Sequence, residues 1–497
     1  MKFSVPVSEE DEEASSPYLL TTPFLYELPT MAPDSGEGTA KNILGAIGKL
    51  PYEVLSLIFI RGVEKQEDNV RKTIIADPKS TTRSATRPYR NFALSVAGVC
   101  KVWRVIAISD PALWRFITVD FDKLVHDVQD LQRATIKYFV FLARDTPLEV
   151  LMLNWATDHP LKALSEAIMP LLRPFWGETH WGSLFLHHVG NPSFSILPEE
   201  LSVKCNHVIA VNAGDKASLT SPPTYFFPIL STTTSMELYG SSSNLLRLCH
   251  IRAFVPTVKG DAPLIQSLKI LFAADEKFDH YRLIITSILF NYELLEHLCI
   301  RSGTLQLASP KLDLNRSTEF TSLKSLDYCM QDLRTGLLYP LTAASPVTIT
   351  FPSLTHLSLS SNSQSMTDEE ITSRAFTPPR TVTHLTLYAN STGFIWVARE
   401  CVLQVLLPHS IYTLELDGDS ESCASVAPLL QAIHCHPILR ERRCIFPELL
   451  TLILKGVQFE FEGISKFVEE QNSTQPSEQQ ATETGIAVQI HACNEDR

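Results

Sequence analysis

The sequence predicts an α/β chain in which a small helical module is followed by a solenoid with a parallel sheet. Two observations lead to this fold class. Near the N-terminus, residues 50–60 and 96–114 are strongly apolar and have the apolar spacing of helices. Farther along, the motif apolar-x-x-apolar-x-apolar recurs about every 30 residues, a period typical of repeats whose units stack.

The first apolar segment begins with Leu50-Pro51. Pro51 suits the first turn of a helix, because the N–H that proline lacks has no partner there and its φ is already helical. A broad apolar stripe follows, formed by Val54, Leu55, Ile58 and Phe59. Leu57 and Ile60 lie off this stripe, so the helix is apolar on more than one side. Such a helix is either deeply buried or holds a partner on its second face.

The second apolar segment repeats this helical spacing. Its apolar positions are Val96, Val99, Cys100, Trp103 and Ile106. Asp110-Pro111 then interrupts the pattern, and Leu113-Trp114 follows.

Together the two segments resemble the F-box, a small three-helix module. The motifs that match, in order, are Leu50-Pro51, the stripe of the first helix, Val99-Cys100-Lys101-Val102-Trp103 and Pro111-Ala112-Leu113-Trp114. The resemblance implies that residues 42–120 form a module that binds the Skp-type linker subunit of a cullin-RING ubiquitin ligase. It implies the following linker-binding residues: Leu50, Pro51, Val54, Leu55, Ile58, Phe59, Val99, Cys100, Trp103, Leu113 and Trp114. We expect the two tryptophans to anchor the core of the module itself, because large aromatic side chains dominate small cores.

One feature departs from the F-box pattern. Residues 61–91 separate the first and second helices, which are normally joined by a short link. This insertion is basic and is interpreted as a solvated loop, similar to insertions in F-box-like proteins of fungi. An alternative interpretation of the two segments is a plain helical hairpin in the core of a larger domain.

The repeat motif is clearest in the second half of the chain. Its central leucines are Leu268, Leu298, Leu326, Leu357, Leu385, Leu414 and Leu452. Weaker copies extend it toward the N-terminus, at Leu148-Leu151-Leu153, Trp181-Leu184-Leu186, Met236-Leu238 and Val208. Apolar positions 4 and 6 of each copy alternate as in a strand, so both point to one side of a sheet.

The segments between the strands return the chain to start the next parallel strand. Several of them have helical character, such as residues 278–290 and 395–407. A strand, a return helix and a further parallel strand describe a leucine-rich-repeat solenoid, which we place at residues 147–465. Two copies, ending at Asn362 and Asn390, resemble degenerate leucine-rich repeats. An ordinary doubly wound α/β sheet is the alternative.

The residue between the two inward apolar positions of each copy points to the other face of the sheet. These residues form the candidate substrate face, expected to be concave: Lys269, Cys299, Asp327, Ser358, Thr386, Glu415 and Ile453. Their charges are mixed, so they identify no particular protein substrate.

The rest of the chain is assigned by composition. Residues 1–41 and 466–497 are polar and are predicted to be disordered tails, and residues 121–146 form a connecting helix. A net charge of −13 argues against nucleic-acid binding. No apolar run approaches the ~18 residues that span a bilayer, so no membrane partner is expected. With no export signal and ten scattered cysteines, we expect reduced thiols and a cytoplasmic or nuclear location.

Sequence motifs of enzymes and metal sites are lacking. The best metal candidate is His434-Cys435-His436 with Cys444, but adjacent side chains cannot easily converge on one zinc ion, so no metal and no cofactor are predicted. The favoured interpretation is an adaptor of a ubiquitin ligase that holds an unknown protein substrate and performs no chemistry itself. The alternatives are a leucine-rich-repeat scaffold whose helical module only caps the solenoid, and an enzyme on an α/β fold.

Overall fold

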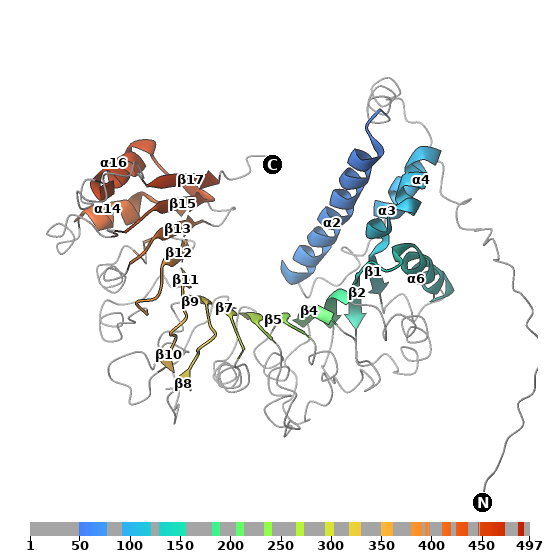
Figure 1. The fold of residues 1–497 in the computed structure, drawn as a ribbon, viewed down its shortest axis with the longest axis horizontal. Helices are drawn as coiled ribbons and strands as arrows, with labels where there is room; N and C mark the ends of the chain where they lie inside the picture. Colours follow the sequence, from blue (N-terminus) through green and yellow to red (C-terminus); the bar gives the residue numbers. More distant parts are fainter. Residues whose placement is uncertain are drawn as a thin grey trace, which may run out of the picture. The chain divides into compact units, whose positions relative to one another are not determined.

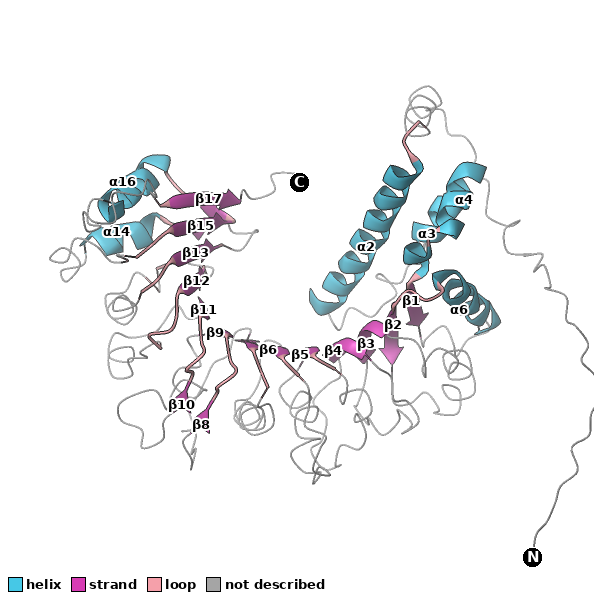
Figure 2. Cartoon of the chain, viewed as in Figure 1, coloured by secondary structure: helices cyan, strands magenta, loops and turns pink. Residues whose placement is uncertain are grey.

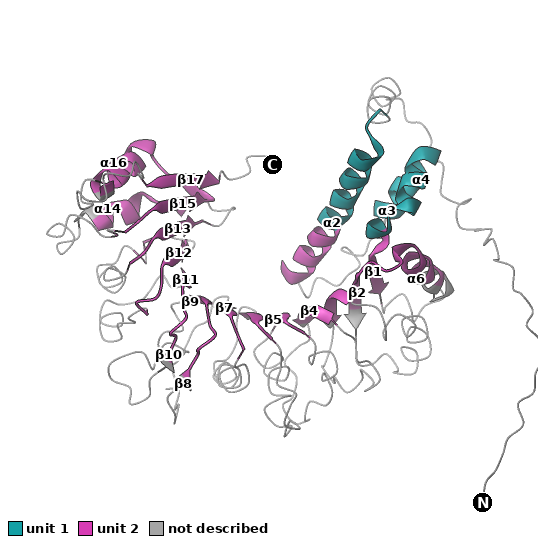
Figure 3. Cartoon of the chain, in the orientation of Figure 1, with its two compact units in different colours: residues 1–66, 89–113 teal, residues 67–88, 114–497 magenta. Residues whose placement is uncertain are grey.

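The computed structural model shows which parts of the chain form regular structure (Figure 1). It describes residues 49–76, 92–120, 129–155, 181–188, 205–212, 233–240, 265–272, 294–302, 318–329, 349–360, 379–389, 393–395, 397, 410–418, 424–435, 446, 448–472 and 486–491. The chain divides into two compact units (Figure 3). Unit 1 comprises residues 1–66 and 89–113, and unit 2 comprises residues 67–88 and 114–497.

Unit 1 is helical in its described part. Its elements are the first part of α2 (Tyr52–Ala76), then α3 (Phe92–Val99), α4 (Lys101–Ser109) and most of the short 3₁₀ helix η2 (Pro111–Trp114). Pro51 precedes α2, and its carbonyl oxygen accepts the first two helical N–H groups, from Val54 and Leu55, each at 3.1 Å. Cys100 caps α4, because its sulfur accepts the N–H of Trp103 at 3.5 Å.

Close packing joins α2 to the helices that follow it within unit 1. The rings of Phe59 and Trp103 lie 4.8 Å apart. Gly62 faces Phe92, and a Cβ at position 62 would lie 2.4 Å from two ring atoms, so any larger residue there would displace the Phe92 ring. Polar contacts add to the packing: the Ser56 hydroxyl donates to Asp110, a residue that ends α4.

The interpretation of residues 61–91 as a loop is wrong for its first part, because α2 continues to Ala76. Strong helix formers such as Glu, Lys, Gln and Arg fill this part of the sequence. Arg71 and Glu67 lie one turn apart, and their charged groups are 3.5 Å apart, which supports the helix further. Residues 77–91 lie outside the described residues.

Unit 2 is built on a 13-stranded sheet in which all neighbouring strands are parallel. In spatial order its strands are β1 (Phe116–Asp120), β2 (Leu148–Trp155), β3 (Trp181–His188), β4 (Cys205–Asn212), β5 (Ser235–Gly240), β6 (Ser267–Phe272), β7 (His297–Ser302), β9 (Ser325–Cys329), β11 (His356–Ser360), β12 (His384–Tyr388), β13 (Thr413–Asp417), β15 (Thr451–Lys455) and β17 (Ala487–His491). Consecutive strands are neighbours, as in a solenoid whose units stack (Figure 2).

Smaller elements accompany this sheet. Two short parallel pairs are formed by β8 (Thr318–Glu319) with β10 (Ile349–Thr350) and by β14 (Ala424–Ser425) with β16 (Val457–Gln458). The helices described in unit 2, besides the end of α2, are α6 (Gln129–Ala143), α14 (Ala427–Cys435) and α16 (Phe461–Asn472).

The central leucines lie in one register across the sheet, so the predicted solenoid with a parallel sheet is confirmed. Each is paired with the next: Leu268, Leu298, Leu326, Leu357, Leu385, Leu414 and Leu452. All of them are at most 2% exposed, so the row is buried from solvent. Main-chain hydrogen bonds run across the strand starts in the same order, for example from Glu296 N to Gln266 O and from Lys324 N to Glu296 O, both at 2.8 Å.

In β2 the predicted register is wrong by one residue. Val150, not Leu151, pairs with Leu184 of the inward row, because the ladder shifts between Leu148 and Glu149. The period-two pattern could not decide this, since four consecutive apolar residues begin at Val150. Strands that are buried on both faces read as continuous apolar runs.

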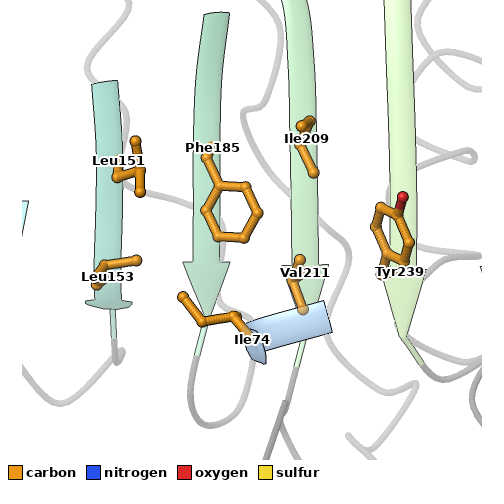
Figure 4. Packing of buried hydrophobic residues seen from close by; sticks show 7 residues of the cluster. All are labelled: Ile74, Leu151, Leu153, Phe185, Ile209, Val211 and Tyr239. Carbon is orange, nitrogen blue, oxygen red and sulfur yellow. The ribbon is translucent and has the colours of Figure 1, made fainter. Parts of the chain in front are cut away.

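The reason β2 is apolar on both faces is helix α2. Ile74 of α2 is 4% exposed and joins a buried cluster on the face opposite the inward row (Figure 4). The other members of the cluster come from four adjacent strands: Leu151, Leu153, Phe185, Ile209, Val211 and Tyr239. The end of α2 therefore covers the first strands of the sheet on that face.

A polar contact fixes the same part of α2 to the sheet. The guanidinium of Arg71 donates to Glu149 at 3.0 Å and to the Ser183 hydroxyl at 3.1 Å. Arg115 lies 3.3 Å from the other oxygen of Glu149. Because a partly buried carboxylate needs partners, this arrangement specifies where the helix lies on the strands.

Two predicted boundaries differ from the structure. The sheet begins at Phe116 with β1, not at residue 147, and Trp114 packs edge-on against Tyr138 and Phe139 of α6 at 5.6 and 5.1 Å. The predicted C-terminal disorder from residue 466 is also wrong in part, since α16 and β17 occupy that range. The amphipathic spacing of α16 and the apolar alternation in β17 explain both elements.

Other predictions lie outside the described residues. These are the N-terminal tail 1–41, the return helix 278–290, Asn362 and Asn390, and all of the return helix 395–407 except residues 395 and 397.

Ile74→Ala is expected to destabilise unit 2 by about 2–4 kcal/mol, because it leaves a cavity in a closely packed cluster. The neighbouring Thr73→Ala is the matched control, since Thr73 is exposed and alanine favours a helix. Urea denaturation of the two variants measures the difference. Equal unfolding free energies would contradict the packing of α2 on the sheet.

Candidate functional site: an apolar strip on unit 1 and a polar face on unit 2

Helix α2 carries two apolar sides within unit 1. Leu55, Phe59 and Val63 recur every four residues and are at most 5% exposed. Val54, Leu57 and Ile58 form a second side, which we call the apolar strip, and their exposures are 39%, 61% and 48%. Residues at this spacing are neighbours on a helix surface. The strip is therefore a continuous apolar surface in contact with solvent.

Helix α4 has a similar exposed side. Val102 and Val105 lie one turn apart and are 62% and 65% exposed. The start of α2 and the end of α4 are tied together, since the hydroxyls of Tyr52 and Ser109 lie 2.5 Å apart. Exposed apolar side chains on two helices of one small unit are typical of surfaces that bind another protein.

The predicted linker-binding residues differ in how exposed they are in the structure. The exposed ones are Leu50, Pro51, Val54, Ile58, Val99 and Cys100. Trp103 is half-buried, and the buried ones are Leu55, Phe59, Leu113 and Trp114. Only the exposed residues are accessible to a partner, and the buried ones belong to the core.

Sequence reasoning missed some of this surface. Tyr52, Val102 and Val105 were not selected as binding residues, although Val102 and Val105 are apolar positions at a helical spacing on α4. Searching each helix for a second apolar stripe would have found them.

On unit 2, the predicted substrate-face residues do form one row. Lys269, Cys299, Asp327, Ser358, Thr386, Glu415 and Ile453 pair in register across seven strands of the sheet. Thr386 and Glu415 are 5% and 8% exposed, and the others are half-buried. We call this row and the residues that interact with it on the same side of these strands the polar face.

Glu237 of β5 extends the row by one strand, and positions two residues away on the seven strands complete the polar face. Residues that sequence reasoning missed include Glu237, Arg301, His356, His384, Tyr388, Asp417 and Lys455. The signal that could have found most of them is the strand period of two, which places every second residue on the same side.

Arg301 contacts two residues of the polar face, Asp327 and Tyr388. It binds Asp327 through two nitrogens, with Nε 3.2 Å from Oδ1 and Nη2 2.5 Å from Oδ2. Its guanidinium carbon lies 4.1 Å from the centre of the Tyr388 ring. Burial lowers the pKa of Arg301, but hydrogen bonds to Asp327 and the charge of that carboxylate outweigh it, so the pKa is raised.

Glu415 is a second centre of contacts. Lys455 donates to it at 2.7 Å, and Nε2 of His384 lies 3.5 Å from its other oxygen. The His384 ring stacks on that of His356 at 4.9 Å. Nearby, burial and the charge of Glu415 raise the pKa of Asp417 above its ordinary value.

Glu237 is the third centre, at the end of the face nearest β4. It forms an ion pair with Lys269 at 3.0 Å, and the Tyr239 hydroxyl donates to it. His207 lies 3.5 Å away through Nε2. Burial and the hydrogen bond to Glu237 raise the pKa of Tyr239 to about 12.

These arrangements suit recognition of another protein. Each cation named here lies beside an acidic group, so the face offers fixed hydrogen-bonding groups with little net charge. The Cys299 thiol is a poor nucleophile, because burial and Asp327 raise its pKa to about 12.

Among the described residues, no group of three His, Cys, Asp or Glu side chains is placed to hold a metal ion. His434 and Cys435 end α14, whereas His436 and Cys444 lie outside the described residues. None of the helices in the described ranges is long and apolar enough to cross a bilayer.

Comparison with known proteins gives no match, either among protein-family models or among curated proteins.

Asp327→Ala is expected to cost about 1–3 kcal/mol of stability, because it leaves a half-buried guanidinium without its bidentate partner. Lys324→Ala removes an exposed ion pair with Glu296 and should cost much less stability, because solvent screens such a pair. Urea denaturation compares the two. A loss for Asp327→Ala no larger than the control would show that the Arg301 pair adds nothing to the fold.

Alkylation of the native chain should modify Cys100 before Cys299. Cys100 is exposed, while the raised pKa of Cys299 leaves very little thiolate at neutral pH. Peptide mapping after timed treatment with iodoacetamide at pH 7.5 should show modification of Cys299 slower by about tenfold or more. Equal rates for the two thiols would contradict the burial of Cys299.

Proposed function

We propose that this chain is the substrate-recognition adaptor of an SCF-type cullin-RING ubiquitin ligase. In this proposal unit 1 is an F-box-like module that binds the Skp-type linker, and unit 2 is a degenerate leucine-rich-repeat solenoid that binds a target protein. The observation that carries the proposal is the apolar strip of Val54, Leu57 and Ile58, exposed on a helix whose opposite side is already buried.

An exposed strip of this kind is unfavourable unless a partner covers it. Burying apolar surface contributes about 25 cal/mol per Å², so leaving three branched side chains in water forgoes several kcal/mol. The buried side of α2 already anchors the helix through Phe59 and Trp103. The strip is therefore not needed for the core, which favours a role in binding.

The order of the F-box-like motifs also supports the proposal. Leu50-Pro51 immediately precedes α2, Val99-Cys100 lies at the junction of α3 and α4, and residues 111–114 form the short helix η2. Each motif thus coincides with the start or end of a helix.

The polar face supports the second half of the proposal. A row of mostly polar side chains, buried or half-buried, runs across seven strands and provides an extended surface, as solenoids offer to protein partners. The adaptor would act by proximity, holding a target near a ubiquitin-charged enzyme, so its own residues would perform no chemistry. This function corresponds to the expected cytoplasmic or nuclear location.

One observation favours a second candidate, a repeat scaffold in which the helical module only caps the solenoid. Within unit 2, the end of α2 covers an apolar part of the sheet through Ile74 and the contact of Arg71 with Glu149. Covering an apolar surface is what a cap does. This role would leave the apolar strip without a function.

The test is binding of the full chain to the purified Skp-type linker, followed by size-exclusion chromatography and calorimetry. Wild type should form a one-to-one complex. Leu57→Asp combined with Ile58→Asp should weaken binding at least about tenfold, since burying an unpaired charge in an apolar interface is costly.

Phe141→Asp is the matched control, because Phe141 is an exposed apolar residue of α6 in unit 2. It should bind the linker like wild type. Circular dichroism establishes that all variants are folded. If wild type does not bind, or if the control and the strip variant bind equally, the adaptor function is wrong and the scaffold is favoured.

A further inference from the structure

Strand β17 is the last strand of the large sheet in the part of the chain that the structure describes. It pairs with β15 on one side, over residues Ala487–His491. All five of its residues are exposed. The sheet therefore ends in an open edge.

Hydrogen bonds show which main-chain groups this edge presents. Ala487 N donates to Leu450 O at 2.8 Å, and His491 O accepts from Gly456 N at 3.3 Å, so these groups point toward β15. The main-chain groups of successive residues in a strand alternate in direction. The N–H and C=O groups of Val488 and Ile490 therefore point to the open side.

Within the described residues, this edge lacks the features that normally protect such strands. Edges are usually blunted by charged residues, proline or a covering segment. The sequence from Ala487 to His491 is AVQIH, with no Lys, Arg, Asp, Glu or Pro. Val488 and Ile490 continue the rows of Leu452 and Leu454 but are 38% and 50% exposed. The apolar layer of the solenoid thus extends to an unprotected end.

We infer that β17 pairs antiparallel with β17 of a second copy of this chain, about a two-fold axis at Gln489. In that register Val488 lies opposite Ile490 of the partner subunit, and the free main-chain groups of both form hydrogen bonds. The apolar side chains of each pair then cover one another on the leucine side of the sheet. Gln489 meets Gln489 of the partner subunit on the other side, where the two amides can bond.

A second copy fits this edge because the strand is complementary to itself. A two-fold interface brings the same surface together, so each residue must tolerate its symmetry mate. Around Gln489 every apolar residue meets an apolar one, the small Ala487 meets His491 of the partner subunit, and no like charges are opposed. A five-residue ladder buries less area than a standard interface, so the dimer is expected to be weak, on the order of micromolar.

The test is sedimentation velocity of the full chain between about 1 and 100 µM, a range set by the expected affinity. Wild type should shift from monomer to dimer with concentration. Gln489→Glu and Gln489→Lys should each weaken the dimer at least tenfold at neutral pH, because each places like charges across the axis. An equimolar mixture of the two variants should form heterodimers, since the opposed charges then attract.

Gln458→Glu is the matched control, an exposed glutamine of β16 at a position outside the large sheet. It should dimerise like wild type, and thermal unfolding establishes that each variant retains its fold. A wild-type chain that stays monomeric at 100 µM overturns the inference. The inference is also overturned if the charged variants at position 489 dimerise as strongly as wild type, or if the two variants do not form heterodimers when mixed. The inference goes beyond the proposed function, and linker binding does not enter its test.

Discussion

The alignment of one leucine per strand across the parallel sheet is the constraint on which unit 2 depends. No single repeat of the solenoid can bury its own apolar face, so each central leucine is covered by its neighbours in the row. Because side chains alternate with a period of two, this register also fixes the opposite side of every strand. Arg301 can bind Asp327, and Lys455 can bind Glu415, only because Leu298, Leu326, Leu414 and Leu452 are held in line.

The first and last turns of helix α2 make different contacts. Its first turns bury Leu55 and Phe59 and expose the apolar strip, whereas its last turns bury Ile74 in the cluster on the sheet. The row of the sheet that begins with Leu151 is apolar under this cluster and becomes polar from Glu237 onward. The position of α2 therefore decides where the polar face begins, and the remaining strands keep their charged residues accessible.

Sequence reasoning found the sheet, its parallel strands and the row of substrate-face residues, because spacing and period-two alternation are local signals. It failed where the decisive contact is not local. Val150 and Leu151 are both apolar, and only the cover supplied by Ile74 explains why Leu151 faces away from the inward row. Similarly, no local pattern predicts the contact between Arg301 on β7 and Tyr388 on β12, because these strands are far apart in the sequence. The continuation of α2 beyond residue 60 was missed because basic residues were taken as a sign of a loop, although they also favour helix.

The pairing of charges on the polar face limits how it can recognise a partner. Lys269, Arg301 and Lys455 each already have an acidic neighbour, so a partner gains little from net charge. Fixed geometry offers more: Asp327 and the Tyr388 ring hold the Arg301 guanidinium in place, so part of its rotamer entropy is already lost before binding. Recognition by such a face rests on the match between its hydrogen-bonding groups and those of the partner. A mixed-charge surface of this kind can be specific for one partner although the chain as a whole carries a net charge of −13.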